Sequence, residues 1–148
     1  MLSKTSRYGV RAVLYIAAYT HEERLIGVRQ LAEKIEISEH MLSKVLQYLT
    51  KRDLIKSKKG RKGGFYMTAD QKSQNLMHVI RELEQTEFLI SACMLGQKHC
   101  KTGMFCPYHE QVTSIRTQLK AIYGTDTIEQ TAHKVMKSYS THIKDNER

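Results

Sequence analysis

Residues that break helices are scarce in this chain. It has one proline (Pro107) and eight glycines among 148 residues. This composition argues against a loop-rich scaffold and favours long helices. No apolar run approaches the roughly 20 residues that span a bilayer, and the N-terminal residues do not follow the pattern of a secretory signal. We therefore expect a cytoplasmic, helical protein without a membrane partner.

Cysteine is also rare, and all three cysteines lie within fourteen residues: Cys93, Cys100 and Cys106. An odd number of cysteines, in a chain expected to be cytoplasmic, makes a disulfide framework an unfavourable interpretation. Metal ligation or redox chemistry by thiolates is the better interpretation, and His109 adds an imidazole three residues after the last cysteine. No paired carboxylates flank the cysteines and no phosphate-binding loop is present, so we expect neither an enzyme nor a small-molecule substrate.

The charge is positive and unevenly distributed. The whole chain has 24 Lys and Arg against 15 Asp and Glu, a formal net charge of +9. Residues 1–70 hold 14 of the basic and 7 of the acidic residues, a net of +7, which leaves 10 and 8, a net of +2, for residues 71–148. A basic half of this kind attracts polyanions, because contact with phosphates releases their counterions. Nucleic acid is the predicted partner, and a merely solvated basic surface is the alternative.

Apolar residues at helical spacing predict three helices in the basic half: residues 3–20, a short one from Val28, and one capped by Ser38. A tight turn at residues 36–37 joins the second to the third, which gives a helix-turn-helix pattern. In that motif the start of the second helix reaches base edges in the major groove. An ordinary helical hairpin is the alternative. The predicted base-reading residues are Ser38, Glu39, His40, Ser43 and Lys44.

A basic hairpin is predicted directly after the helix-turn-helix. Residues 54–57 and 65–67 are expected to form two short strands, joined by a glycine-bearing turn. Such a hairpin is a wing, whose cations would lie over phosphates or enter the minor groove; an exposed loop that only aids solubility is the alternative. The predicted DNA-binding residues of the wing are Lys58, Lys59, Arg61, Lys62, Gly63 and Gly64.

Three more helices are expected beyond the wing. Ser73 is predicted to cap one that carries Leu76 to Leu83, and a last helix is expected over residues 127–142. Between them a helix is predicted to start at Pro107 and to stop at Gly124. Its apolar residues repeat every 3.5 positions, as in a coiled coil, which predicts a homodimer. Because the repeat covers only two heptads, packing on the same chain is the alternative. The repeat comprises Tyr108, Val112, Ile115, Leu119 and Ile122.

Four stretches together resemble the Rrf-two family of winged-helix transcription regulators: MLSKTSRYGVRA, KSKKGRKGGFYMT, HVIRELEQ and the cysteine triplet. The resemblance covers residues 1 to about 137. It implies a mainly α fold, with a winged helix-turn-helix domain over residues 1–84 that includes a small two-stranded β wing. A cysteine-bearing cluster loop over residues 85–106 and a long dimerisation helix with a C-terminal helix over residues 107–148 would follow. The implied function is that of a homodimeric regulator, in the first instance a repressor, on a double-stranded DNA operator.

The resemblance also implies an iron–sulfur cluster held by Cys93, Cys100 and Cys106. The family's iron–sulfur biogenesis regulator has a histidine where His109 stands, whereas its nitric-oxide-sensitive repressor takes an acidic ligand near the N-terminus. Because no Asp or Glu precedes Glu22 here, His109 is favoured as the fourth ligand. A 2Fe–2S cluster is favoured over 4Fe–4S, and the implied stimulus is iron–sulfur status, redox state or nitric oxide. A metal-free thiol sensor and a zinc site are the alternatives.

Two features depart from the family pattern. The first gap between cysteines is one residue longer than usual. The predicted recognition helix lacks the proline that is common at its start and has Ser43 where a glutamate is common. The DNA sequence preference of relatives therefore cannot be transferred to this chain.

Overall fold

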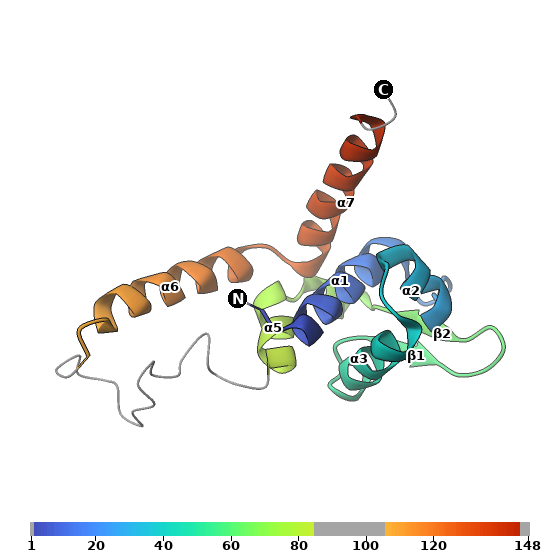
Figure 1. Ribbon diagram of the computed structural model, residues 1–148. Coiled ribbons are helices and arrows are strands. Elements are labelled where there is room, and N and C mark those ends of the chain that lie inside the picture. Colours follow the sequence, from blue (N-terminus) through green and yellow to red (C-terminus); the bar gives the residue numbers. More distant parts are fainter. Residues whose placement is uncertain (1, 85–105, 146–148) are drawn as a thin grey trace.

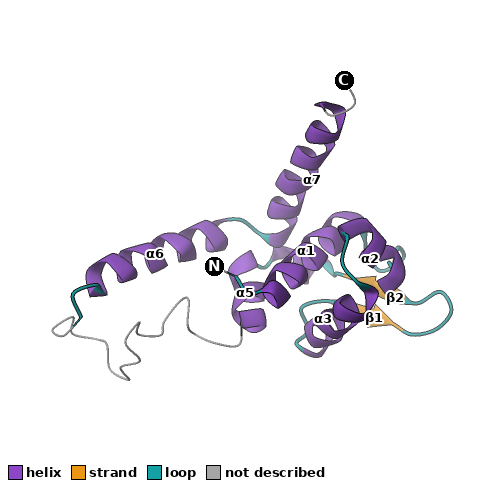
Figure 2. Cartoon of the chain, in the orientation of Figure 1, coloured by secondary structure: helices purple, strands orange, loops and turns teal. Residues whose placement is uncertain are grey.

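The computed structural model describes residues 2–84 and 106–145 (Figure 1). Helices dominate, and the described residues form one two-stranded antiparallel sheet (Figure 2). The prediction of a mainly α fold with a small β wing is confirmed. In chain order the elements are α1 (Lys4–Tyr19), α2 (Val28–Ile35), α3 (Glu39–Lys51), β1 (Lys56–Lys58), β2 (Gly64–Tyr66), α4 (Ala69–Ser73), α5 (Leu76–Glu84), α6 (His109–Thr125) and α7 (Ile128–Asp145).

Helix α1 is the centre of the core and packs against α3, α5 and α7. Its N-terminus is fixed by Ser3, whose hydroxyl accepts a hydrogen bond from the backbone N–H of Ser6 at 3.1 Å. A serine in this position satisfies a backbone donor that the helix itself leaves unpaired. Its apolar residues recur at helical spacing, so they form one buried face. The fully buried members of this face are Ala12, Val13 and Ile16.

The start of α1 also holds the end of α5. The backbone N–H of Ser3 donates to the Glu84 carboxylate at 2.8 Å, and a Cβ at Gly9 would lie 2.5 Å from a methyl group of Leu83. Burial works to raise the pKa of Glu84, but hydrogen bonds from Ser6 and Ser3 outweigh it and leave that pKa below its ordinary value. Glycine at position 9 therefore permits close packing of α1 against α5, and the hydrogen bonds to the Glu84 carboxylate stabilise this contact.

Helix α5 begins differently from the prediction. Ser73 is the last residue of α4, so the predicted serine cap on the following helix is wrong. The carboxamide oxygen of Asn75 accepts from the backbone N–H of His78 at 3.1 Å and takes the capping role. The short α4 was not predicted, although Thr68 and Gln71 form a reciprocal capping box at its start.

Helices α6 and α7 lie in opposite environments. Helix α7 is docked on α1 through Ile128 and Ala132, which are each 1% exposed, whereas α6 buries no residue (Figure 1). Helix α6 starts two residues after Pro107 and continues through Gly124, so both predicted ends are displaced by one or two residues. None of the helices in the described ranges is both long and apolar enough to cross a membrane.

Candidate nucleic-acid interface and cysteine site

The turn between α2 and α3 is held at both ends. Glu36 ends α2 in the left-handed conformation with φ of 53°, and the backbone N–H of Ile37 donates to the carbonyl of Ala32 at 3.1 Å. The Arg11 guanidinium donates to the carbonyl of Ile35, which ties the end of α2 to α1. The helix-turn-helix is thus a fixed unit of the core.

Helix α3 has an inner and an outer face. Ser38 caps it, since the serine hydroxyl accepts from the backbone N–H of Met41 at 3.4 Å. Leu42, Val45, Leu46 and Leu49 form the buried face. The base-reading residues predicted from sequence lie outside the core: Ser43 is half-buried, and the exposed ones are Ser38, Glu39, His40 and Lys44.

The far end of α3 is tied to α5. The Tyr48 hydroxyl donates to the carbonyl of Glu82 at 2.8 Å, and the Arg52 guanidinium lies 3.5 Å from the carboxylate of the same residue. Arg52 also stands over the Tyr48 ring, 5.5 Å from its centroid. The orientation of α3 is therefore set by polar contacts at its C-terminal end in addition to its apolar face.

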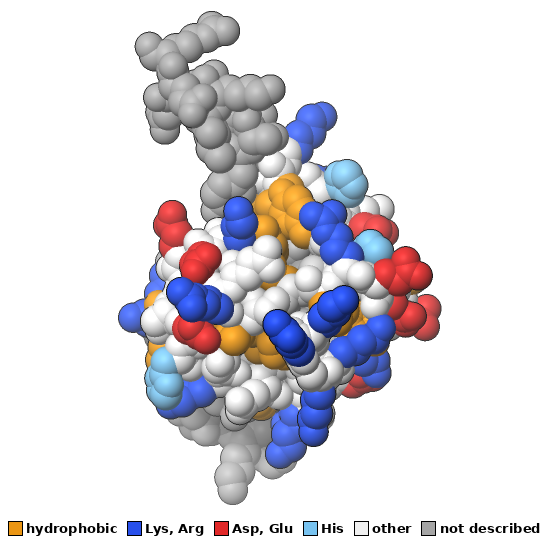
Figure 3. Space-filling model, turned by 90° about the vertical axis from the view of Figure 1, so that its right-hand side faces the viewer, with side chains coloured by type: hydrophobic (Ala, Val, Ile, Leu, Met, Phe, Trp, Pro, Cys, Tyr) orange, Lys and Arg blue, Asp and Glu red, His pale blue; other side chains and the backbone are white. Residues whose placement is uncertain are grey.

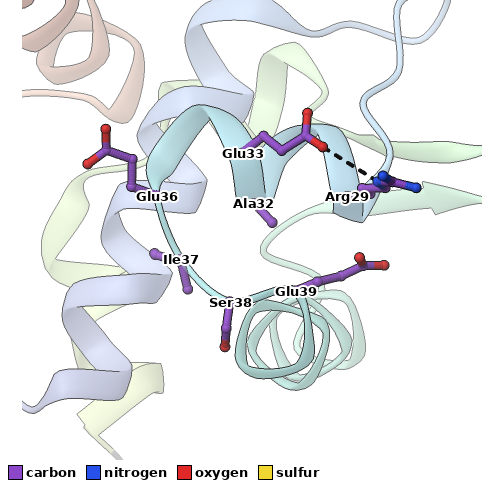
Figure 4. A pocket seen from close by; sticks show the side chains of 7 residues that line it. All are labelled: Arg29, Ala32, Glu33, Glu36, Ile37, Ser38 and Glu39. Carbon is purple, nitrogen blue, oxygen red and sulfur yellow. Dashed lines mark ion pairs between the residues drawn. The ribbon is translucent and has the colours of Figure 1, made fainter.

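A hollow of about 340 Å³ opens between α2 and the start of α3 (Figure 4). Three carboxylates line it, from Glu33, Glu36 and Glu39, and the one cation among its lining residues is Arg29, which pairs with Glu33 at 3.5 Å. Excess negative charge repels phosphate. This hollow is therefore a poor site for a phosphate group.

The predicted wing is present. Strands β1 and β2 pair in register, with Lys56 opposite Tyr66 and Lys58 opposite Gly64. A Cβ at Gly63 would lie 2.2 Å from the carbonyl oxygen of Lys58, and one at Gly64 would lie 2.7 Å from the carbonyl oxygen of Ile26. Only glycine fits such close backbone contacts. The two glycines that were predicted as DNA-binding residues thus also shape the hairpin.

The wing cations differ in their surroundings. Lys59, Arg61 and Lys62 lie exposed around the turn, and Lys and Arg side chains gather on the face of the molecule toward which this turn points (Figure 3). Lys58 instead donates from Nζ to the carbonyl of Glu22 at 2.7 Å. At the base of the wing, Asp53 accepts a hydrogen bond from Lys56 and thereby raises the pKa of that ammonium.

One part of the wing was missed from the sequence. Ile26 and Phe65 exchange two backbone hydrogen bonds, of 3.1 and 2.8 Å, so a short third segment pairs with β2. The available signal was the apolar pair Leu25-Ile26 after a polar loop, but two residues are too few to predict a strand.

Half of the predicted cysteine site falls within the described residues. Cys93 and Cys100 lie outside them. Cys106 is half-buried, and its carbonyl accepts from the backbone N–H of His109 at 3.1 Å, at the first residue of α6. Across residues 2–84 and 106–145, no three His, Cys, Asp or Glu side chains form a group that could hold a metal. A thiol and an imidazole one turn apart are donors that suit iron–sulfur clusters and zinc.

Comparisons with known proteins agree with this geometry. Residues 2–134 match the family Rrf2, described as an iron-dependent transcriptional regulator. The chain is 30% identical over 105 residues to the HTH-type transcriptional regulator NsrR of Oceanobacillus iheyensis, and the aligned segment covers 71% of each protein. Among solved structures it is similar to CymR, the global cysteine regulator of B. subtilis, with a TM-score of 0.73 at 23% identity over 90% of this chain and 97% of that one. It is also similar to T. potens IscR, with a TM-score of 0.71 at 18% identity, over 93% and 90% of the two chains.

Proposed function

This chain belongs to the Rrf2 family of transcriptional regulators, which are not enzymes, and we propose that it is a cytoplasmic, homodimeric repressor that reports iron–sulfur status, redox state or nitric oxide to DNA. The observation that carries the DNA-binding part is a helix-turn-helix joined to a basic wing in one packed body. In this proposal residues 1–84 bind DNA, residues 85–106 hold the sensor and residues 107–148 form the dimer.

On DNA, α3 would lie in the major groove. Ser38, Glu39 and His40 would approach base edges from its first turn, with Ser43 and Lys44 one turn further on. The wing turn would bring Lys59, Arg61 and Lys62 to the phosphates. Because the hollow beside α3 is acidic, the wing would supply most of the electrostatic attraction.

The dimer would form along α6. Tyr108, Ile115 and Ile122 are 55%, 57% and 65% exposed, and they continue the 3.5-residue repeat of half-buried Val112 and Leu119. A second copy of α6 is the occupant that matches such a repeat. Two-fold symmetry would also present two copies of α3 to DNA, and paired half-sites require these to lie about one helical turn apart, roughly 34 Å.

The sensor would be an iron–sulfur cluster, with 2Fe–2S favoured over 4Fe–4S. Its ligands would be Cys93, Cys100 and Cys106, with His109 as the fourth. The iron dependence in the family's description and the similarity to NsrR support this choice. When bound, the cluster would supply reactivity toward oxidants and nitric oxide. The position of Cys106 three residues before the start of α6 would let ligation order the approach to the dimer helix.

A metal-free thiol sensor is the second candidate. It is favoured by Cys106, a free cysteine that is only half-buried. Oxidation to a sulfenic acid or a disulfide would then be the signal, and the DNA-binding body would be unchanged.

Anaerobic purification, followed by absorption spectroscopy and iron and sulfide analysis, separates the two candidates. We expect coloured protein with at least two irons per chain for a cluster of this kind, and a colourless, iron-free preparation would contradict it. Cys100→Ala and Cys106→Ala should abolish the spectrum. His109→Ala should shift it, whereas His133→Ala, which alters an exposed histidine on α7, should not.

The DNA part is tested with a duplex selected from a random pool by the anaerobic protein. Holo protein should then differ in affinity for that duplex from both apo protein and Cys100→Ala, which lack the cluster. Equal affinity in all three would eliminate the sensor but leave DNA binding, and failure to select any duplex would eliminate DNA binding itself.

A further inference from the structure

Lys58 makes contacts that set it apart from the other wing cations. Its Nζ donates to the carbonyl oxygen of Glu22 at 2.7 Å and stands over the Tyr66 ring, 5.2 Å from the centroid. Glu22 lies in the turn between α1 and α2, 36 positions earlier in the chain. Nζ of Lys58 thus bridges the end of β1 to the helical body.

The turn that receives Lys58 is itself well fixed. His21 and Arg24 exchange backbone hydrogen bonds of 3.1 and 3.0 Å. Just before them, the buried Thr20 accepts from Nζ of Lys72 through its carbonyl at 2.7 Å. The turn that holds Glu22 is exposed, and it is tied to the core through the neighbouring Thr20.

The wing meets this segment at two points. Phe65 of β2 pairs with Ile26 through two backbone hydrogen bonds, and Lys58 of β1 reaches Glu22. The base of the hairpin is anchored by the buried Ile55 and Met67. The contact of Lys58 with Glu22 additionally ties β1 to the same segment that pairs with β2, which limits how far the wing can tilt. A wing fixed before binding loses less conformational freedom on DNA, which favours affinity.

We propose that Lys58 is a positioning residue that sets the angle of the wing, and that phosphate contact falls to Lys59, Arg61 and Lys62. This inference rests on the proposed DNA binding. It changes the role of Lys58 from the phosphate contact predicted from its charge and place in the sequence. The distinction is measurable, because a phosphate contact changes the salt dependence of affinity and a positioning contact does not.

The test compares Lys58→Met with Lys59→Met, two substitutions that remove one charge and keep an unbranched stem. Affinity for the selected duplex is measured across a salt series. A lost phosphate contact lowers the slope of log affinity against log salt by about 0.9, which we expect for Lys59→Met. Lys58→Met should weaken binding by about 3- to 10-fold, the range for one lost hydrogen bond, with the slope unchanged. Lys58→Arg, which can still donate to the Glu22 carbonyl, should restore affinity.

Amide hydrogen exchange of the free protein gives an independent readout. Lys58→Met should speed exchange across the wing strands, and Lys59→Met should not. The positioning role would be overturned if both variants lowered the slope of log affinity against log salt equally. It would also be overturned if Lys58→Met left affinity and hydrogen exchange unchanged. Hydrogen exchange is measured without DNA, so it tests the contact between Lys58 and Glu22 independently of DNA binding. If the wild-type protein bound no duplex, the proposed function would be refuted, but the exchange result would still stand.

Discussion

Helices α3 and α6 have similar apolar repeats and opposite surroundings. Helix α3 buries Leu42, Val45, Leu46 and Leu49 under its own chain, whereas α6 buries none of its residues. An apolar stripe predicts that one face of a helix is buried, but it does not identify the surface against which that face packs. The apolar face of α3 is buried within its own protomer, whereas we propose that the apolar face of α6 is buried against α6 of a second protomer.

Energetics should separate the two helices in the same way. A fully buried aliphatic side chain contributes about 1.5 to 3 kcal/mol through removal from water, and more when truncation leaves a cavity. An exposed side chain contributes little to the free energy of unfolding of its own protomer. Substitutions in α3 should therefore act on folding, and substitutions along the exposed residues of α6 should act on assembly.

The largest expected effect is that of Leu46→Ala in α3. Leu46 is 0% exposed, so its truncation should lower the free energy of unfolding by about 2 to 5 kcal/mol. Urea denaturation followed by circular dichroism measures this loss. Gln47→Ala, at the exposed neighbouring position, is the control and should change stability by under about 0.5 kcal/mol. A similar value for both variants would mean that α3 is not held by its apolar face.

The next effect concerns α6. The double substitution Ile115→Ser and Ile122→Ser should weaken dimerisation at least 100-fold, on the order expected from four lost aliphatic contacts per dimer. Sedimentation equilibrium measures the dissociation constant. Lys120→Ser, at another exposed position of α6, should leave it unchanged. An intact dimer in the double variant would mean that a different surface joins the protomers.

Local signals predicted the helix-turn-helix and the wing well. Ser38 capped the expected helix, and the wing formed where a basic, glycine-bearing turn separated two short apolar runs. These features depend on residues near one another in sequence, so pattern and geometry agree.

What could not be predicted depends on contacts between distant residues. The pairing of Ile26 with Phe65 and the reach of Lys58 to Glu22 span 39 and 36 positions, respectively. Nothing in the neighbourhood of Lys58 distinguishes it from Lys59, because the partner that does so lies in another turn. Cys93 and Cys100 fall outside the described residues, so their role as ligands stays a prediction.

A smaller effect is expected from Ser38→Ala. The serine hydroxyl satisfies one backbone donor at the start of α3, and loss of such a cap costs about 1 kcal/mol. Urea denaturation should detect this loss. Ser43→Ala, within α3, removes the same hydroxyl away from the cap and should be neutral or slightly stabilising, because alanine has the higher helix propensity. Equal effects at both positions would contradict the capping role.

The smallest effect, and the one most sensitive to pH, is that of Glu84→Gln at the junction of α1 and α5. The pKa of Glu84 is lowered below its ordinary 4.5. The ionised carboxylate therefore stabilises the folded state above that pH, and the contribution is lost as pH falls through the folded pKa.

The stability difference between wild type and Glu84→Gln should accordingly be constant near neutral pH and should shrink below pH 4.5. Urea denaturation across a pH series measures it, and Glu23→Gln, at an exposed position between α1 and α2, controls for the loss of one negative charge. A difference that grew as the pH fell would mean that the neutral carboxyl is the form that holds α1 to α5. The neutral carboxyl could still accept from the Ser3 backbone through its carbonyl oxygen, and its hydroxyl would have to donate an additional hydrogen bond.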